Sequence, residues 1–256
     1  MLSVRKKLVV GNWKMNGGQS QNAALIDGLK GLVPADVDVV VCPPYPYLAQ
    51  VKALVDGAGV GLGAQDLSSR KCGAFTGDVA ASMLLDVGCE WVLVGHSERR
   101  TLHGEGNQLI AAKIAAALEA GLVPILCVGE TLEERDGGRA EEVVSSQLAS
   151  VVSELGVVVM AGLVVAYEPV WAIGVGGTPA EAAYVEEIHD FLRQVLIDRY
   201  GPPGAAVPLL FGGSVNIDNA RDYARLANVD GLFIGRSAWE PDLFEAIMVA
   251  LDDLIR

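Results

Sequence analysis

Short apolar runs recur along the chain and alternate with longer stretches in which apolar residues repeat at helical spacing. Each run is nearly continuous in hydrophobic residues, which is typical of parallel strands that are covered on both faces. Eight runs fit this description, at residues 8–11, 37–42, 60–64, 91–94, 123–128, 163–167, 207–211 and 231–234. The pattern therefore predicts a parallel sheet.

The stretches between the runs predict helices over residues 107–119, 140–155, 179–200 and 241–255, with a shorter one over 218–226. Thr178 is the predicted N-cap of the third of these helices, and Pro179 is its predicted first residue. Eight strand–helix units in 256 residues predict an α/β protein, a (β/α)8 barrel that forms a single domain over residues 1–256. A doubly wound open sheet is the alternative. No GxGxxG motif follows the first run, which disfavours a dinucleotide-binding fold.

The overall charge and the cysteines limit the classes of partner. A formal net charge of -13 argues against nucleic acid and against anionic membranes as partners. The longest apolar stretches end before the ~18 residues of a membrane span, and the first residues contain no signal-peptide core, so we expect a cytoplasmic protein. The four cysteines form no CxxC pair, and Cys42 and Cys127 lie within apolar runs. This placement favours buried free thiols over metal ligands or disulfides.

Polar residues follow most of the predicted strands. The reacting groups of a (β/α)8 barrel gather at the carboxyl ends of its strands, so we expect these residues to converge on one mouth. They are Asn12, Lys14, Gln65, His96, Ser97, Glu98, Glu168, Ser214, Gly235 and Arg236.

Glu168 ends an apolar run and is followed at once by Pro169 and then by Gly174, Gly176 and Gly177. By itself, such a glutamate is most simply a charged strand end that meets solvent. Beside a loop that can close, it is also the kind of base that removes a proton next to a carbonyl. The other strand ends favour the second interpretation.

His96 and Lys14 would complete such a site. Ser97 could cap a helix whose positive end keeps the His96 imidazole neutral, and a neutral imidazole can donate a hydrogen bond to an oxyanion. Lys14 would attract an anion, and Glu98 could pair with it. The glycines near Ser214 and Gly235 would let backbone N–H groups approach a phosphate.

Seven motifs together resemble the triosephosphate isomerase family, in the family's order and over essentially the whole chain. They are GNWKMN at residues 11–16, GAQD at 63–66, TGD at 76–78, GHSERR at 95–100, CVGE at 127–130, YEPVWAIG at 167–174 and GGSVN at 212–216. Several motifs in register are very specific, so the chain is identified as similar to this family.

The resemblance implies roles for the residues that match. Glu168 would move a proton between neighbouring carbons, and His96 would act as a neutral electrophile on the enediolate oxygens. Lys14 would supply positive charge, with Asn12 assisting. Backbone N–H groups of Gly174, Ser214, Gly235 and Arg236 would hold the phosphate. A lid at about residues 170–178 would close over the substrate, and no metal or other cofactor is implied.

The resemblance also implies a homodimer, in which the loop at residues 72–77 enters the partner near Lys14. Thr76 stands where the family's crossing threonine would be.

Three departures from the family's pattern concern phosphate binding or the lid. The lid reads GVGG at residues 174–177 instead of GTGK, so Val175 replaces a threonine. Phe211 replaces a tyrosine whose hydroxyl helps to hold the closed lid, and Arg236 replaces a glycine. The proton-transfer residues are unchanged. The substrate is therefore either a triose phosphate or a slightly longer tetrulose phosphate, with the same reaction in both cases.

Two other classes of function remain to be tested. A lyase would use Lys14 as a Schiff-base nucleophile, but pairing with Glu98 would keep the amine protonated. A barrel that only binds a phosphosugar would take up ligand without exchanging its protons with solvent, and it would have no use for Glu168 and His96.

Overall fold

The computed structural model describes residues 7–174 and 176–252. Parallel strands form a closed barrel in sequence order, because β1 pairs with both β2 and β8. The strands are β1 (Lys7–Asn12), β2 (Val37–Cys42), β3 (Val60–Ala64), β4 (Trp91–Val94), β5 (Val123–Val128), β6 (Val164–Tyr167), β7 (Leu209–Phe211) and β8 (Gly231–Ile234). The (β/α)8 barrel expected from the sequence is confirmed, and the open sheet is excluded.

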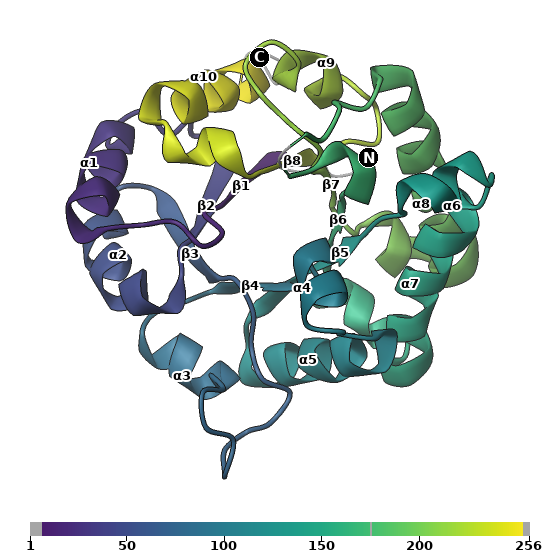
Figure 1. Ribbon diagram of the computed structural model, residues 1–256, viewed down its shortest axis with the longest axis horizontal. Helices are drawn as coiled ribbons and strands as arrows, with labels where there is room; N and C mark the ends of the chain where they lie inside the picture. The colour runs from purple at the N-terminus through teal and green to yellow at the C-terminus, as the bar shows by residue number, and fades with distance from the viewer. Residues whose placement is uncertain (1–6, 175, 253–256) are drawn as a thin grey trace.

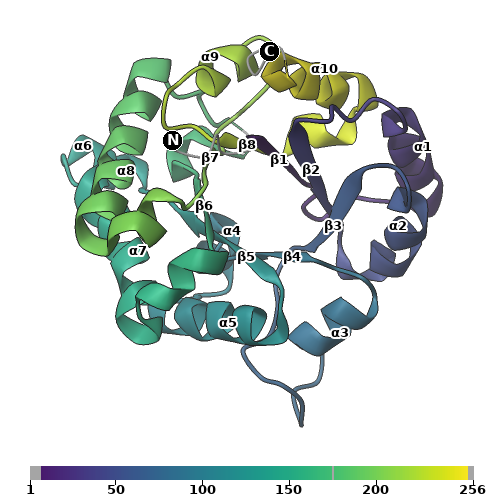
Figure 2. The same cartoon turned by 180° about the vertical axis from the view of Figure 1, so that it is seen from behind.

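Helices surround the barrel in a ring that is visible from both sides (Figures 1 and 2). The α-helices are α1 (Gln19–Leu29), α2 (Leu48–Val55), α3 (Ala81–Asp86), α4 (Ser97–Leu102), α5 (Asn107–Ala120), α6 (Leu132–Asp136), α7 (Ala140–Leu155), α8 (Ala182–Ala205), α9 (Ala220–Ala224) and α10 (Pro241–Asp252). Short 3-10 helices are η1 (Tyr45–Tyr47), η2 (Val157–Gly162), η3 (Val170–Ala172) and η4 (Arg236–Trp239).

Alternate residues of each strand enter two different cores. In β1, Val10 belongs to the cluster inside the barrel, whereas Val9 belongs to the cluster between the strands and the helices. The inner cluster also contains Cys42, Cys127 and Phe233. Because each strand is buried on both faces, its sequence is almost continuously apolar, which is why the strands could be predicted. Cys42 and Cys127 are buried free thiols, as expected.

The start of α8 was predicted wrongly. The helix begins at Ala182 with Glu181 as its N-cap, so Thr178 and Pro179 do not start it. The reason is tertiary: Ala180 is buried, and its carbonyl accepts a hydrogen bond from the Tyr223 hydroxyl at 2.6 Å. This contact keeps the chain out of the helix for three more residues.

Other boundaries differ by a few residues. The strand predicted over 207–211 begins at Leu209, after Pro208, which cannot donate to a ladder. The helix predicted over 241–255 begins as expected at Pro241, and its last predicted residues, 253–255, lie outside the described part of the chain.

The loop between β3 and α3 projects away from the barrel in both views (Figures 1 and 2). It carries the exposed residues Phe75 and Thr76. Ser68 stabilises the loop by donating to Asp78 at 2.6 Å, and its backbone N–H donates to Val79.

In the described part of the chain, none of the helices combines the length and the apolar character that crossing a membrane would require.

Candidate active site

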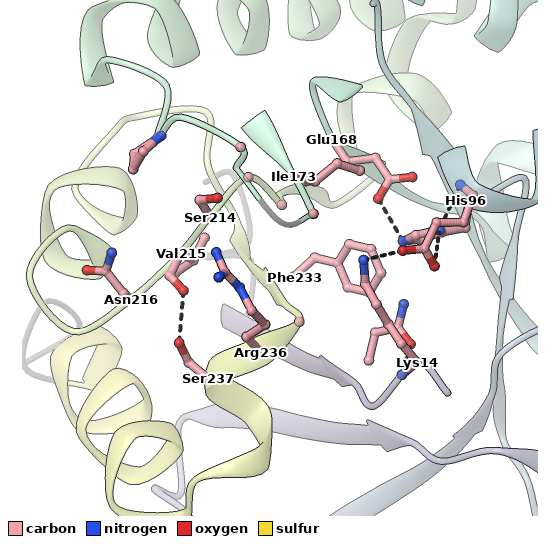
Figure 3. A pocket seen from close by; sticks show the side chains of 18 of the residues that line it. Lys14, His96, Glu168, Ile173, Ser214, Val215, Asn216, Phe233, Arg236 and Ser237 are labelled. Atoms are coloured by element: carbon pink, nitrogen blue, oxygen red, sulfur yellow. Dashed lines mark hydrogen bonds and ion pairs between the residues drawn. The ribbon is translucent and has the colours of Figure 1, made fainter. Parts of the chain in front are cut away.

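A cavity of about 640 Å³ opens at the carboxyl ends of the strands. Its lining includes Glu98 and every residue to which the resemblance gave a role in catalysis or phosphate binding, namely Asn12, Lys14, His96, Glu168, Gly174, Ser214, Gly235 and Arg236. Figure 3 shows two groups in it: Lys14, His96 and Glu168 on one side, and Ser214 and Arg236 on the other. The strand ends therefore converge on one mouth, with acid–base groups on one side and a guanidinium on the other.

Lys14 has a left-handed backbone, with φ of 50°, which is unfavourable for a residue that has a Cβ. Two side chains hold it in this conformation. Asn12 Oδ1 accepts a hydrogen bond from the Lys14 backbone N–H at 2.9 Å, and Gln65 Nε2 donates to the Lys14 carbonyl at 2.8 Å. The strained backbone directs the ammonium into the cavity.

Glu98 pairs with Lys14, as expected from the sequence, with Oε1 at 2.7 Å from Nζ. Partial burial favours a higher pKa for Glu98, but the hydrogen bond from Lys14 and the charges of its neighbours lower the pKa overall. Glu98 is therefore an anion at neutral pH. The pair orients the Lys14 ammonium.

His96 is the N-cap of α4, because its Nδ1 accepts a hydrogen bond from the Glu98 backbone N–H at 3.2 Å. The prediction that Ser97 caps this helix was wrong, since Ser97 is the first helical residue. An Nδ1 that accepts must carry a lone pair, so the proton of a neutral imidazole resides on Nε2. That nitrogen faces Glu168 in the cavity, at 3.2 Å from its Oε2.

Glu168 follows β6 directly and is only 2% exposed. Its Oε1 accepts a hydrogen bond from the Ser97 backbone N–H at 2.8 Å, while its own N–H donates to Val128. Gly129 makes the close approach of β5 possible, because a Cβ there would lie 2.0 Å from the Glu168 carbonyl oxygen. The carboxylate is thus held in a buried position by backbone contacts.

The chain after Glu168 is anchored by Glu130. Its carboxylate accepts hydrogen bonds from Trp171 Nε1 at 2.7 Å, from the Tyr184 hydroxyl at 2.9 Å and from the Tyr167 hydroxyl at 3.1 Å. The guanidinium of Arg135 stacks 4.1 Å above the Trp171 ring. These contacts fix the first residues of the predicted lid. Val175, at its tip, lies outside the described residues.

The opposite side of the cavity is built from the ends of β7 and β8. Ser214 has a left-handed backbone with φ of 47°, and its Oγ donates to the Ala172 carbonyl at 2.6 Å. Gly212 and Gly213 have no room for a side chain, since an added Cβ would approach Phe233 and Phe211 to 2.8 and 2.9 Å. Arg236 is exposed at the cavity wall and brings positive charge to this side.

The family model described as triosephosphate isomerase matches residues 7–251. The chain belongs to the triosephosphate isomerase family. Curated relatives named triosephosphate isomerase are similar over nearly their whole length. The protein of Dechloromonas aromatica is 49% identical over 245 residues, covering 95% of this chain and 98% of that protein. The protein of Alcanivorax borkumensis is 48% identical over 248 residues, covering 97% and 99%. The resemblance seen in the motifs is confirmed.

Gln65 and Ser97, which were also expected at the mouth, do not line the cavity, and neither does Thr76. It lies in the exposed loop between β3 and α3. Sequence reasoning gave no role to three residues that the structure connects to the site, namely Gln65, Glu130 and Tyr223. The GAQD and CVGE motifs contained the first two, but Tyr223 lies in no motif.

Proposed function

We propose that this protein interconverts glyceraldehyde 3-phosphate and dihydroxyacetone phosphate by proton transfer through an enediolate. The observation that carries the proposal is the meeting of Glu168 and His96 Nε2 at 3.2 Å, beside the paired Lys14, in one cavity. Relatives about half identical to this chain carry the name triosephosphate isomerase, and this favours the triose phosphate over a tetrulose phosphate.

Glu168 acts as the base. Its carboxylate removes a proton from the carbon next to the carbonyl, and the electrons of that C–H bond move to the carbonyl oxygen to give an enediolate. The same carboxylate then returns the proton to the neighbouring carbon. Because Glu168 is buried and held through Ser97, it meets the substrate from a fixed direction, which favours a near-attack geometry.

His96 and Lys14 stabilise the oxygens on which charge develops. The Nε2–H of a neutral His96 donates to these oxygens and relays a proton between them, while the Lys14 ammonium supplies a full positive charge. Asn12 holds the Lys14 backbone and borders the same oxygens. Glu98 positions Lys14 from behind.

The phosphate is bound on the opposite side of the cavity by backbone N–H groups of Gly174, Ser214, Gly235 and Arg236. The chain has a net charge of -13, so attraction of an anionic substrate depends on local positive groups. The exposed guanidinium of Arg236 is such a group. It adds charge where the family's usual glycine has none.

The lid closes over the bound substrate and excludes water. This matters because an enediolate that carries a phosphate on the next carbon can eliminate it. The hydrogen bonds of Trp171 to Glu130 and of Ser214 to Ala172 support a lid that moves on a fixed base.

The lyase alternative is disfavoured by the Lys14–Glu98 pair at 2.7 Å, because a protonated amine does not attack a carbonyl. Borohydride trapping with substrate would leave an adduct on Lys14 if the lyase were correct. The binding-only alternative predicts no exchange of substrate protons with heavy water.

The test compares kcat/KM on glyceraldehyde 3-phosphate for the wild type, Glu168→Asp and the exposed control Glu186→Asp. Shortening Glu168 by one methylene moves the carboxylate away from the carbon, and we expect kcat/KM to fall about 100-fold. The control should keep wild-type activity. If Glu168→Asp is as active as the control, Glu168 is not the base. If the wild type prefers erythrulose 4-phosphate, the substrate assignment is wrong.

We also propose a cytoplasmic homodimer, with the loop between β3 and α3 as part of the contact. Phe75, on this loop, and Met15, next to Lys14, are 44% and 96% exposed, which suits a surface that a second copy covers. Thr76→Arg should then yield monomers in sedimentation, with lower kcat/KM. An unchanged sedimentation coefficient would refute this contact. One cooperative unfolding transition is expected of the single domain.

A further inference from the structure

Tyr223 makes a contact at the carboxyl end of the lid, and it lies in none of the seven sequence motifs. Its side chain is almost fully buried on α9, and its hydroxyl donates to the Ala180 carbonyl at 2.6 Å. Ala180 is itself buried and lies between the lid and the first residue of α8. The hydrogen bond therefore fixes the chain where the lid ends.

The Tyr223 ring also reaches the other end of the lid through Phe211. The two rings lie 4.4 Å apart between centroids, at an interplanar angle of 50°. An added Cβ at Gly213 would lie 2.9 Å from Phe211 Cζ and 3.3 Å from the Ala172 Cβ, so both groups border Gly213. Ala172 in turn accepts the hydrogen bond of Ser214. Tyr223 thus holds the carboxyl end of the lid directly, through Ala180, and is linked to its amino end only through Phe211 and Gly213.

The Tyr223 hydroxyl is well suited to be a permanent donor. Burial, together with the charge of Asp222, raises the pKa of Tyr223 above its usual value, so the hydroxyl stays protonated. β7 ends in Phe211, which has no hydroxyl, and the hydroxyl that bonds to the Ala180 carbonyl comes from another element. In this chain α9 supplies it.

We propose that Tyr223 is a positioning residue of the isomerase, which fixes the carboxyl end of the lid through Ala180. It does not touch the substrate. Its effect is to make the lid close in one position, so that the enediolate stays shielded until Glu168 returns the proton. The inference rests on the proposed isomerase reaction and adds a residue to it.

The test uses Tyr223→Phe, which removes the hydroxyl and keeps the ring on Phe211. In an imperfectly closed site, the enediolate electrons form a new double bond, the C–O bond to phosphate breaks, and inorganic phosphate leaves with that electron pair. The remaining enol becomes a dicarbonyl. The measured quantity is the inorganic phosphate released per isomerisation turnover. This ratio does not depend on the fraction of folded enzyme.

We expect the ratio to rise roughly two- to tenfold in Tyr223→Phe, which is the factor given by one net hydrogen bond. The matched control is Tyr47→Phe, which loses a hydroxyl that donates to the Gly17 carbonyl at 3.1 Å, away from the lid. The control should keep the wild-type ratio. KM should change more in Tyr223→Phe than in the control, because lid closure contributes to substrate binding.

A ratio in Tyr223→Phe that equals or falls below that of Tyr47→Phe would overturn the inference, even if the variant were less stable. This result differs from failure of the proposed function. If the wild type does not isomerise the triose phosphate at all, the proposed function is wrong. If the wild type is active but the phosphate released per turnover does not rise in Tyr223→Phe, only the role of Tyr223 in positioning the lid is refuted.

Discussion

Replacing Gly129 by alanine would test how accurately the backbone must place Glu168. A Cβ at this position would lie 2.0 Å from the Glu168 carbonyl oxygen, and Cβ contacts in proteins are essentially never shorter than 3.0 Å. Gly129→Ala must therefore displace the end of β6 by about 1 Å, and a shift of this size costs about 100-fold in rate. This corresponds to about 2.7 kcal/mol in the activation free energy.

The variant also loses stability, so a control with an equal clash is needed. Gly231→Ala provides it, because its Cβ would lie 1.9 Å from the Leu8 carbonyl oxygen at the beginning of β8, the end of the strand opposite the cavity. Overpacking of this kind costs roughly 1–3 kcal/mol in either variant. A second control, Gly106→Ala, has open space around the added methyl.

The assay is kcat/KM on glyceraldehyde 3-phosphate, with urea unfolding and circular dichroism to measure the folded fraction. Per folded molecule, we expect the large loss only in Gly129→Ala. Equal losses in Gly129→Ala and Gly231→Ala would show that activity follows general stability. A folded Gly129→Ala with kcat/KM within about twofold of wild type would refute the argument that a shift of this size matters.

Three further outcomes are expected. Lys113→Met removes the ammonium that binds the carboxylates of both Asp66 and Glu105, which keep their ion pairs with Arg99, so urea unfolding should show a loss of about 1–3 kcal/mol. Arg236→Gly should raise KM and weaken inhibition by inorganic phosphate severalfold, most strongly at low ionic strength, and an unchanged inhibition constant would remove the guanidinium from phosphate binding. Burial lowers the pKa of His189 to about 4 in the folded protein. Between about pH 6.5 and 4 the unfolded chain therefore binds a proton at His189 that the folded protein does not, so the free energy of unfolding should fall as the pH drops through this range. In His189→Asn this slope should become shallower, as measured by unfolding at each pH.

The barrel could be predicted because its strands are buried on both faces and its helices are not. Five strands begin and end at the predicted residues, and the others differ by at most two. The start of α8 could not be predicted, since Pro179 after Thr178 is a normal beginning of a helix. Only the burial of Ala180 against Tyr223 delays the helix, and this contact joins residues 43 positions apart.

The positions of the polar groups were predictable for the same reason, since strand ends meet at one mouth. The residues that hold these polar groups in position could not be predicted. Gln65 was recognised as a strand-end residue, but its bonds to the Lys14 and Cys42 carbonyls depend on the path of the chain after β1 and on the position of the end of β2. The cap of α4 was assigned to Ser97 because serine is the commoner cap, whereas the imidazole of His96 takes the position.

Lys14 and Ser214 are the non-glycine residues with positive φ in residues 7–174 and 176–252, and they lie on opposite sides of the same cavity. Glycine would relax either backbone, so Ser214→Gly in particular would remove an unfavourable conformation that costs on the order of 1 kcal/mol. It would also delete the hydroxyl that holds Ala172. The backbone at Lys14 and Ser214 thus lowers the stability of the fold at two points that flank the substrate. Selection for thermostability alone would favour substitutions at these two positions first, and such substitutions would damage the site.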